Sequence, residues 1–414
     1  MGDRADVLFV HNNFPAQFGF IAAALKARGW RCAAVGSPTA RSADIPVRHW
    51  KLARGTGKDV FPYAVRAEAD FLRAQAAAKV AVDLKAKGFD PDVIVGHPGW
   101  GETLLLHDVF PRARQVLHGE FYYHATGADV GFDPEFGQPG EDERWRIEAK
   151  NATLALAYVG AEAIVAPTPF QASQFPSVFA PRIRTIHEGV DTDRIRPRPD
   201  ARLKIKDGPT LDRSTPVVTF INRNFEPLRG FNTFMRALPA LLEAVPQAHA
   251  VLIGNKGQRG YGGDAGEGRT WAERMLQEVG GRLDMGRVHF MGNVPHDVML
   301  DAVSIAAAHV YYTYPFVLSW SCLEAMACEA YVIGSDTGPV QDAITDGVDG
   351  RLLPFSDVDA LSSAMIEACT HRDRFDALRK AARLSAVERW DRTRLTLPAW
   401  LAVIDAARAA ALAA

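Results

Sequence analysis

The feature that most constrains the fold is an alternation of short apolar runs with longer amphipathic segments. A short run that is apolar throughout is typical of a strand in a parallel sheet covered on both faces. In the first half of the chain the runs lie at 7–10, 31–35, 93–95, 115–117 and 163–165, and helical patterns lie at 20–28, 63–86, 101–109 and 142–159. This alternation predicts a doubly wound α/β domain.

The same alternation restarts after residues 194–215, a stretch that is rich in proline and charge and has little periodicity. Strands are expected at 217–221, 250–253, 288–290, 309–312 and 331–334, and helices at 230–245, 270–280, 296–304, 321–328 and 357–370. We therefore predict an N-terminal domain over 1–195, a linker over 196–215, a C-terminal domain over 216–388, and helices over 389–414 that pack back on the first domain. Two such domains joined by a linker predict a cleft between them, and the ligands of open α/β sheets bind at the carboxyl ends of the strands.

Composition excludes several classes of protein. The 414 residues hold 47 Lys and Arg against 49 Asp and Glu, a formal charge of −2, so no overall cationic field favours nucleic acid. With 48% hydrophobic and 23% charged residues, the chain is typical of a folded globular protein. The four cysteines form no C-x-x-C pair, which indicates reduced thiols in the core: Cys32, Cys322, Cys328 and Cys369.

The apolar run at 7–10 is too short for a signal peptide, so a cytoplasmic protein is expected. The alanine-rich residues 397–414 are expected to form a helix packed on the protein body rather than a membrane anchor. A mild basic excess over 66–87 leaves a peripheral membrane contact open, although a solvated helix face is favoured there. The oligomeric state is not specified by the sequence.

Four segments stand out from this background, at 186–194, 221–231, 314–327 and 334–350, together with a glycine-bearing loop at 13–19. In their order and spacing they resemble family 4 of the glycosyltransferases. The resemblance implies the two-domain GT-B fold and transfer of a sugar, with retention of configuration, from a nucleotide-diphosphate sugar. The acceptor would be a saccharide, a lipid-linked molecule or a small molecule with a hydroxyl group. It implies a donor bound mainly by the C-terminal domain, an acceptor bound mainly by the N-terminal domain, and no metal or other cofactor.

Two arginines, Arg223 and Arg229, lie where the strand at 217–221 leads into the next helix. Guanidinium groups in this place can bind a diphosphate bidentately and stabilise the negative charge that grows on the leaving group. Both are therefore candidate catalytic residues. The family more often has lysine at the second place, one residue earlier than Arg229.

The segment 314–327 supplies further candidates for donor binding. Ser321 can start a helix, and free amides at a helix N-terminus bind phosphate. The candidates for main-chain contacts are Leu318, Ser319, Trp320 and Ser321. By resemblance, Glu324 accepts hydrogen bonds from the ribose hydroxyls, and further donor contacts fall at Gly19, Gly254, Asn293 and Val294.

The chain departs from the family pattern at Phe316, where the first of two motif glutamates is expected. A phenyl ring cannot accept a hydrogen bond from a sugar hydroxyl, so the donor sugar would be held differently, for example by Tyr312 or Tyr314. This departure keeps two alternatives open. One is an epimerase-like enzyme of nucleotide sugars, and the other is a catalytically silent protein that binds them.

Polar residues also follow two strands of the first domain. His118 and Glu120 come after the strand at 115–117, and His97 comes after the strand at 93–95. The family often has a histidine near the anomeric carbon, and His118 matches it, with Glu120 as a second catalytic candidate. His97 and Phe18 are assigned to the acceptor side.

Two D-x-D strings, at 191–193 and 357–359, are candidates for metal binding, but neither is expected to hold an ion. The first lies in a turn, and the second lies at a helix start capped by Ser356. The glycine-rich stretch over 257–268 does not open a helix as G-x-G-x-x-G, so no nicotinamide site is expected and a surface loop is favoured.

Overall fold

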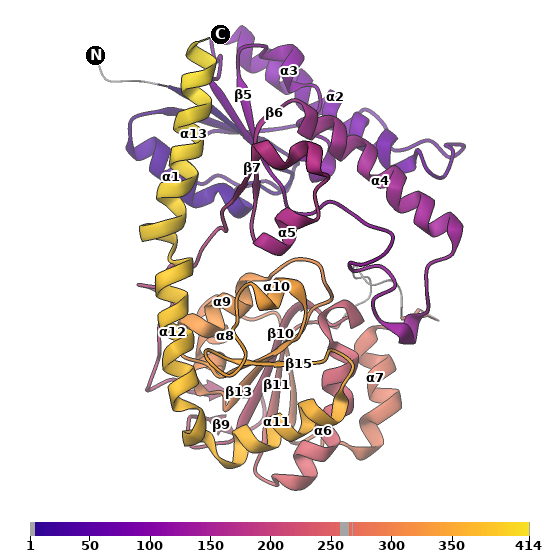
Figure 1. Cartoon of the computed structure of the whole chain (residues 1–414), viewed down its shortest axis with the longest axis vertical. Helices are drawn as coiled ribbons and strands as arrows, with labels where there is room; N and C mark the ends of the chain where they lie inside the picture. Colours follow the sequence, from indigo (N-terminus) through magenta and orange to yellow (C-terminus); the bar gives the residue numbers. More distant parts are fainter. Residues whose placement is uncertain (1–4, 257–264, 267, 414) are drawn as a thin grey trace. The chain divides into compact units, whose positions relative to one another are not determined.

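A computed structural model describes residues 5–256, 265–266 and 268–413 (Figure 1). The chain forms two compact units, one of Met1–Glu188 with Thr393–Ala414 and the other of Gly189–Arg392. Most of the glycine-rich stretch, residues 257–264 and 267, lies outside the described residues.

The first unit is built on a parallel sheet with the strand order β3-β2-β1-β4-β5-β6-β7. Its strands are β1 (Asp6–Val10), β2 (Arg31–Gly36), β3 (Val47–His49), β4 (Val93–Gly96), β5 (Arg114–His118), β6 (Ala161–Ala166) and β7 (Ile183–Thr185). Its helices are α1 (Gly19–Ala27), α2 (Val65–Ala86), α3 (Leu106–Val109), α4 (Glu141–Val159), α5 (Pro169–Ser173) and α13 (Leu397–Leu412).

Both faces of this sheet are buried, as the continuous apolar runs predict. In β1, Val7 and Phe9 belong to a cluster with side chains of α1 and α13, whereas Leu8 and Val10 belong to a cluster with α2. Successive side chains of a strand point to opposite faces, so a strand covered on both sides must be apolar at every position.

The C-terminal helix α13 packs on the first unit, where it contacts β4, β5 and β6 (Figure 1). Trp400, Leu401 and Ile404 are buried in the core. Residues Arg392–Leu412 are also long and apolar enough to cross a membrane by length and composition, with a mean hydropathy of 1.4 and 28% of the window buried. In the structure the buried face of this segment packs into the core of the first unit.

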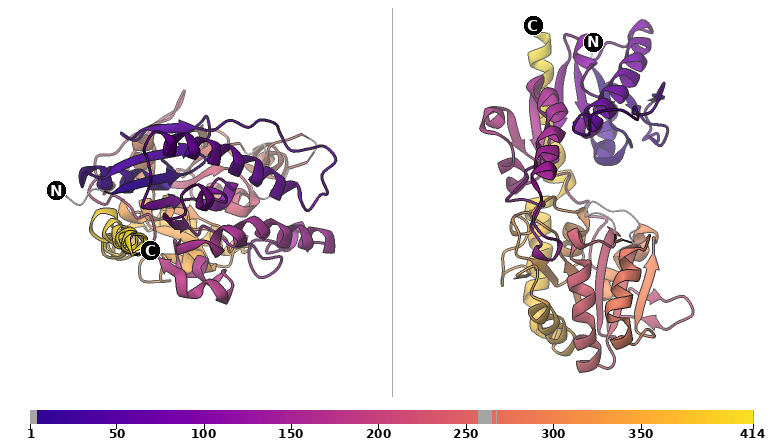
Figure 2. Two further views of the ribbon diagram at one scale, coloured as in Figure 1. Left: turned by 90° about the horizontal axis from the view of Figure 1, so that it is seen from above. Right: turned by 90° about the vertical axis from the view of Figure 1, so that its right-hand side faces the viewer.

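The second unit also has a parallel sheet, with the strand order β12-β11-β10-β13-β14-β15, which Figure 2 shows beside its helices. Its strands are β10 (Val217–Asn224), β11 (His249–Asn255), β12 (Val288–Gly292), β13 (Ala308–Tyr311), β14 (Val332–Ser335) and β15 (Arg351–Leu353). Its helices are α6 (Phe231–Ala244), α7 (Trp271–Val279), α8 (His296–Ile305), α9 (Trp320–Ala327), α10 (Gly338–Gln341), α11 (Val358–Thr370) and α12 (Asp376–Trp390). In both sheets the order reverses beside the first strand, so the predicted doubly wound α/β class is confirmed.

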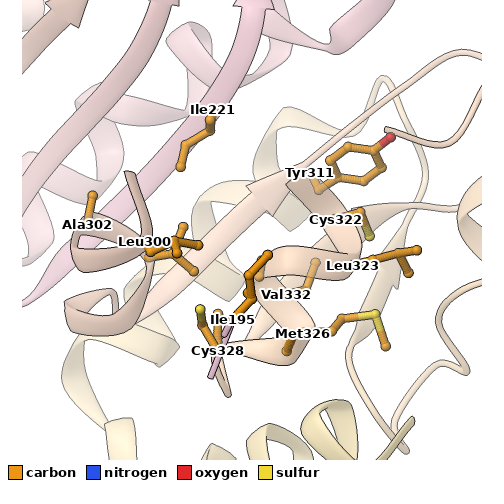
Figure 3. Packing of buried hydrophobic residues seen from close by; sticks show 14 of the residues in the cluster. Ile195, Ile221, Leu300, Ala302, Tyr311, Cys322, Leu323, Met326, Cys328 and Val332 are labelled. Carbon is orange, nitrogen blue, oxygen red and sulfur yellow. The ribbon is translucent and has the colours of Figure 1, made fainter. Parts of the chain in front are cut away.

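Helix α9 lies deep in the core of the second unit. Figure 3 shows side chains of this helix, among them Leu323 and Met326, close to Ile195, Leu300 and Val332 in one apolar cluster. This burial fixes the helix, and with it the loop that precedes the helix.

The structure differs from the sequence-based expectations at several places, among them the end of the first domain, which is Glu188 rather than residue 195. The helix expected over 101–109 is reduced to α3, because residues 98–105 form a short 3-10 turn and loops. The segment expected as a linker, 196–215, holds an antiparallel pair, β8 (Leu203–Lys204) and β9 (Thr210–Leu211). Leu203 and Leu211 are buried in the core of the second unit, so this segment is part of that unit.

A buried arginine closes the end of α8 in the second unit. The side chain of Arg379 is 4% exposed, and its guanidinium donates hydrogen bonds to the carbonyls of Ala306 and Ala307. We expect Arg379→Ala to lower the free energy of unfolding by about 2–4 kcal/mol, because it removes a buried side chain and its hydrogen bond to the carbonyl of Ala307, whereas Ala306 still accepts from Arg372. Urea denaturation of the full chain, followed by circular dichroism, measures this loss.

The matched control is Arg374→Ala, which removes an exposed arginine 3.6 Å from Glu367 in the same part of the chain. Exposed ion pairs contribute little, so this variant should unfold at nearly the wild-type urea concentration. Equal shifts in the two variants would contradict the proposed role of Arg379.

Candidate active site

The turn from β10 into α6 requires glycine at position 230. Gly230 has φ 71°, in the left-handed region, and a Cβ there would lie 2.4 Å from the Cβ of Tyr312. The turn can therefore pack directly on the end of β13, and it places the preceding residue, Arg229, over the loop that follows β13.

Arg229 is held by neutral oxygen atoms. Its Nη1 donates to Thr313 Oγ1 at 2.9 Å and to the carbonyl of Val317 at 3.1 Å. Thr313 is fixed in turn, since its amide donates to Ser335 Oγ at 3.0 Å. In the described part of the chain no carboxylate lies within ion-pair distance of Arg229, so its charge is available to an anion.

Arg223 lies in β10 and is exposed. The residues described around it make no hydrogen bond or ion pair to its guanidinium. The structure thus fixes Arg229 in place and leaves Arg223 as a solvated arginine of the same strand-to-helix segment.

The loop after β13 ends at the N-terminus of α9. Ser319 is the N-cap residue, and its amide donates to the hydroxyl of Tyr311 at 2.6 Å. Trp320 and Ser321 occupy the first two helical positions, whose amides have no acceptor within the helix. Of the four candidates for main-chain contacts, Leu318 is buried in the core and Trp320 is 39% exposed.

Glu324 lies one turn inside α9. Its Oε1 is 3.0 Å from Nε2 of His296, the first residue of α8. The Glu324 side chain is 14% exposed and that of His296 is 38% exposed. This carboxylate therefore lies near solvent with one neighbour that can orient it.

Three neighbouring strands of the second unit end in a row of asparagines. Asn293 follows β12 and donates to Asn255 Oδ1 at 2.9 Å, and Asn255 donates to Asn224 Oδ1 at 3.4 Å. A Cβ on Gly254 would lie 1.9 Å from the carbonyl oxygen of Asn222, so only glycine permits this approach of β11 to β10. Val294 packs against the core.

The aromatic residues near the missing motif glutamate are buried. Phe316 is 3% exposed, Tyr312 is 0% exposed and Tyr314 is 7% exposed. The rings of the two tyrosines lie 5.6 and 5.0 Å from the ring of Phe355. All three side chains are thus buried, and the two tyrosines pack against Phe355.

The first unit has a row of histidines at the carboxyl edge of its sheet. His11, His97 and His118 come directly after paired positions of β1, β4 and β5, which are adjacent strands. The ring of His97 lies 5.3 Å from that of His11 and 5.2 Å from that of His118. All three rings are almost completely buried.

Aromatic side chains enclose the histidines. The buried ring of Phe18 meets His11 and His118 edge-on, at 5.7 and 6.2 Å. Phe18 therefore supports the histidines from within the core. Gly19 is the first residue of α1, and a Cβ there would lie 3.2 Å from the Cβ of Pro15.

Each of two histidines in this row faces a carboxylate. Nε2 of His97 is 3.4 Å from Glu120 Oε2, while Nδ1 of His97 accepts a hydrogen bond from the amide of Gly99 at 3.0 Å. Nε2 of His118 is 3.3 Å from Glu188 Oε1. Glu120 is 36% exposed and can also accept a hydrogen bond from a ligand, whereas Glu188 is buried.

Burial controls protonation in this cluster. Burial lowers the pKa of His118 to about 4, although the negative charge of Glu188 opposes this shift. The pKa of His11 is lowered to about 3 by burial and by the nearby rings of His97 and His118. The partial burial of Glu120 would by itself raise its pKa, but the hydrogen bond from His97 and the nearby histidines lower this pKa to about 2. At neutral pH the site therefore presents neutral imidazoles at His11 and His118 and an ionised carboxylate at Glu120.

Sequence reasoning missed two members of this cluster, His11 and Glu188. His11 has the same signal as His97, since it directly follows the apolar run at 7–10. Glu188 lies in the segment 186–194, in which the family resemblance assigns no role to this carboxylate.

Both D-x-D strings have structural roles. Asp191 Oδ1 accepts a hydrogen bond from the amide of Arg194, and Thr192 donates to Asp391. Asp357 caps α11 by accepting from the amide of Ala360 at 2.9 Å, so the cap is Asp357 rather than the expected Ser356. No group of three or more His, Cys, Asp or Glu side chains suited to a metal ion occurs in the described ranges.

Comparison with protein families gives one match in each half of the chain. Residues 28–195 match the family described as glycosyl transferase family 4 group, and residues 215–371 match glycosyl transferases group 1.

Two curated relatives are mannosyltransferases. A GDP-mannose-dependent alpha-(1-6)-phosphatidylinositol monomannoside mannosyltransferase of Mycobacterium tuberculosis H37Rv is 24% identical, over 97% of this chain and 99% of the relative. The Mycolicibacterium smegmatis protein of that name is 30% identical, over 59% of this chain and 63% of the relative.

Solved structures share the fold. Sucrose-phosphate synthase from Thermosynechococcus elongatus has a TM-score of 0.72 at 19% identity, covering 98% of this chain and 100% of that one. Anabaena HepE in complex with UDP and glucose has a TM-score of 0.68 at 16% identity, covering 97% and 99%.

The buried histidines predict how stability depends on pH. His11, His118 and His309 have folded-state pKa values of about 3, 4 and 4, against 6.5 as the ordinary value. Between pH 6.5 and about 4 the unfolded chain therefore binds more protons at these sites, and the stability falls as the pH falls. Glu102 opposes this trend, because burial raises its pKa to about 7, but three histidines outweigh one carboxyl group.

Melting temperatures measured from pH 7.5 to 4.5 test this expectation. His118→Asn should reduce the slope by about one proton, or about 1.4 kcal/mol per pH unit. A flat profile for the wild-type protein between pH 6.5 and 4.5 would contradict the assignment of neutral buried histidines.

Proposed function

Since the chain belongs to family 4 of the glycosyltransferases and has the GT-B fold, we propose that it moves a sugar from a nucleotide-diphosphate sugar to a hydroxyl group of an acceptor, with retention of anomeric configuration. Retention is the outcome that family membership implies. The acceptor is a saccharide, a lipid-linked molecule or a small molecule that carries a free hydroxyl group.

The observation that carries this proposal is the fixed, unneutralised guanidinium of Arg229. Its partners, Thr313 Oγ1 and the Val317 carbonyl, are dipoles that orient the group without cancelling its charge. A cation oriented in advance stabilises a growing negative charge without reorganisation during the reaction. The first amides of α9 add a partial positive charge from the same loop.

In the proposed reaction, the bond from the anomeric carbon to the diphosphate oxygen breaks and a bond from that carbon to the acceptor oxygen forms. The proton of the acceptor hydroxyl passes to an oxygen of the departing diphosphate. Arg229 stabilises the charge on that leaving group, so the protein need not supply a carboxylate nucleophile. The remaining contribution of the protein is to position the two substrates.

Glu324 suits the ribose of the donor. Its carboxylate can accept hydrogen bonds from two hydroxyl groups, and the neighbouring His296 orients one of its oxygens. On the first unit, the exposed oxygen of Glu120 suits a hydroxyl of the acceptor, because His97 already holds the other end of that carboxylate.

The donor that the relatives favour is GDP-mannose. The curated relatives are named as GDP-mannose-dependent mannosyltransferases that act on a phosphatidylinositol mannoside. The HepE complex contains UDP and glucose, so UDP-glucose is the second donor to test. We propose a cytoplasmic enzyme, with peripheral contact to a membrane if the acceptor is a lipid.

We also propose that the reaction needs no divalent cation. Both D-x-D strings are engaged in a turn or a helix cap, which supports this proposal. Transfer in the presence of EDTA should equal transfer with added Mg²⁺ or Mn²⁺, and a requirement for either ion would contradict it.

The role of Arg229 predicts a specific kinetic defect. Arg229→Ala should lower kcat by about 10²–10³-fold, because the charge on the leaving group loses its stabilising cation. Binding of the free nucleoside should change less than threefold. Steady-state kinetics with GDP-mannose or UDP-glucose, together with calorimetric titration of the nucleoside, measure both effects.

Arg282→Ala is the matched control, since Arg282 is an exposed arginine of the same unit, and it should retain wild-type kcat. Equal losses of kcat and of nucleoside binding in Arg229→Ala would contradict the role of Arg229 at the leaving group. Conversion of the donor without an acceptor would instead identify an epimerase-like enzyme, and binding without any turnover would identify a silent nucleotide-sugar-binding protein.

A further inference from the structure

The carboxylate of Glu188 lies between two imidazoles. Its Oε1 is 3.3 Å from Nε2 of His118, and its Oε2 is 3.5 Å from Nε2 of His187. All three side chains are almost completely buried, with residue exposures of 5% for Glu188, 1% for His118 and 3% for His187. A buried carboxylate needs hydrogen-bond donors, and the His118 imidazole lies within 3.3 Å of one of its oxygens.

This arrangement selects one tautomer of His118. An ionised carboxylate only accepts hydrogen bonds, so the nitrogen facing it, Nε2, carries the proton. Burial keeps the ring neutral at pH 7 by lowering its pKa to about 4. Nδ1 is then the atom with the free lone pair, and among the described residues it is buried without a hydrogen-bond partner.

Both groups are held by the segment that leads into the C-terminal helix. Thr396 precedes α13, and its hydroxyl lies 3.4 Å from the carbonyl oxygen of Glu188. Trp400 of α13 is stacked on the ring of His118, with 6.4 Å between centroids and 19° between planes. The backbone of Glu188 and the ring plane of His118 are therefore fixed by neighbouring parts of one element.

We propose that Glu188 is a positioning residue, which holds the His118 ring in one orientation as its Nε2–H tautomer, with the buried Nδ1 unprotonated. The proposal rests on the proposed transfer reaction for its consequence in catalysis. The tautomer itself is a property of the free protein. The partner hydrogen bond of a histidine determines which of its nitrogens is protonated, and here that partner is Glu188.

Nuclear magnetic resonance tests the tautomer without any substrate. Long-range ¹H–¹⁵N spectra of the full chain labelled with ¹⁵N-histidine distinguish the two neutral tautomers, and His118→Asn identifies the signals of His118. The wild-type protein should show a protonated Nε2 and an unprotonated Nδ1 at pH 7. In Glu188→Ala, His118 should become a mixture of tautomers.

Two further variants separate positioning from general structural support. Glu188→Gln retains an oxygen that accepts from Nε2–H, so it should retain the wild-type tautomer. Glu162→Gln removes an equivalent charge from a 40%-exposed glutamate of the same unit and should leave the His118 spectrum unchanged. Loss of packing alone would lower stability without changing the tautomer.

The kinetic consequence is a loss of kcat with little change in KM. Glu188→Ala should lower kcat about 10–100-fold and change the donor KM less than threefold, and Glu188→Gln should recover most of the lost rate. A wild-type spectrum with a protonated Nδ1 would overturn the proposal, and so would a wild-type tautomer in Glu188→Ala. If Glu188→Ala does not fold, the spectra of the wild-type protein and of Glu188→Gln still test which nitrogen of His118 is protonated. Absence of transfer with every donor would instead contradict the proposed function and leave the tautomer result intact.

Discussion

The hydrogen bonds from Arg229 to Thr313 and Val317 are the contacts on which the second unit's site depends. They connect the turn after β10 to the loop after β13, and the strands that carry these segments are adjacent in the sheet. Because the accepting oxygens are neutral, they orient the guanidinium without cancelling its charge. A carboxylate partner would cancel it. The site therefore keeps a fixed positive charge at the carboxyl edge of the sheet, where α/β proteins bind their ligands.

The surrounding structure serves to keep that charge in place. Gly230 allows the turn to pack on Tyr312, and Ser335 fixes Thr313 from the neighbouring strand. The hydroxyl of Tyr311 holds Ser319, which begins α9, and the buried face of α9 fixes the helix in the core. In the first unit, the neutral rings of His11 and His118 and the ionised carboxylate of Glu120 lie at the equivalent edge of a similar sheet. The second unit thus presents a cationic group and the first unit presents hydrogen-bond acceptors, which are the groups that the proposed transfer reaction uses.

The sequence could predict the architecture because each buried parallel strand must be apolar on both faces, and this requirement marks the strands of both sheets. The sequence also predicts His97 and His118 at strand ends, and Arg229 and Glu324 near helix starts. It could not reveal that Glu188 contacts His118, because 70 residues separate them and the contact depends on how the chain returns to the sheet. The β8–β9 pair was missed because its strands are two residues long, and the polar residues around them conceal the buried Leu203 and Leu211.

The most direct measurement is a crystal structure of the protein with a bound nucleoside diphosphate. The guanidinium of Arg229 should lie within hydrogen-bond distance of the terminal phosphate while it keeps its contacts to Thr313 and Val317, and the first amides of α9 should face the same phosphate. A diphosphate bound elsewhere, or an Arg229 that must leave Thr313 to reach it, would contradict the assignment of this residue as the fixed charge of the site.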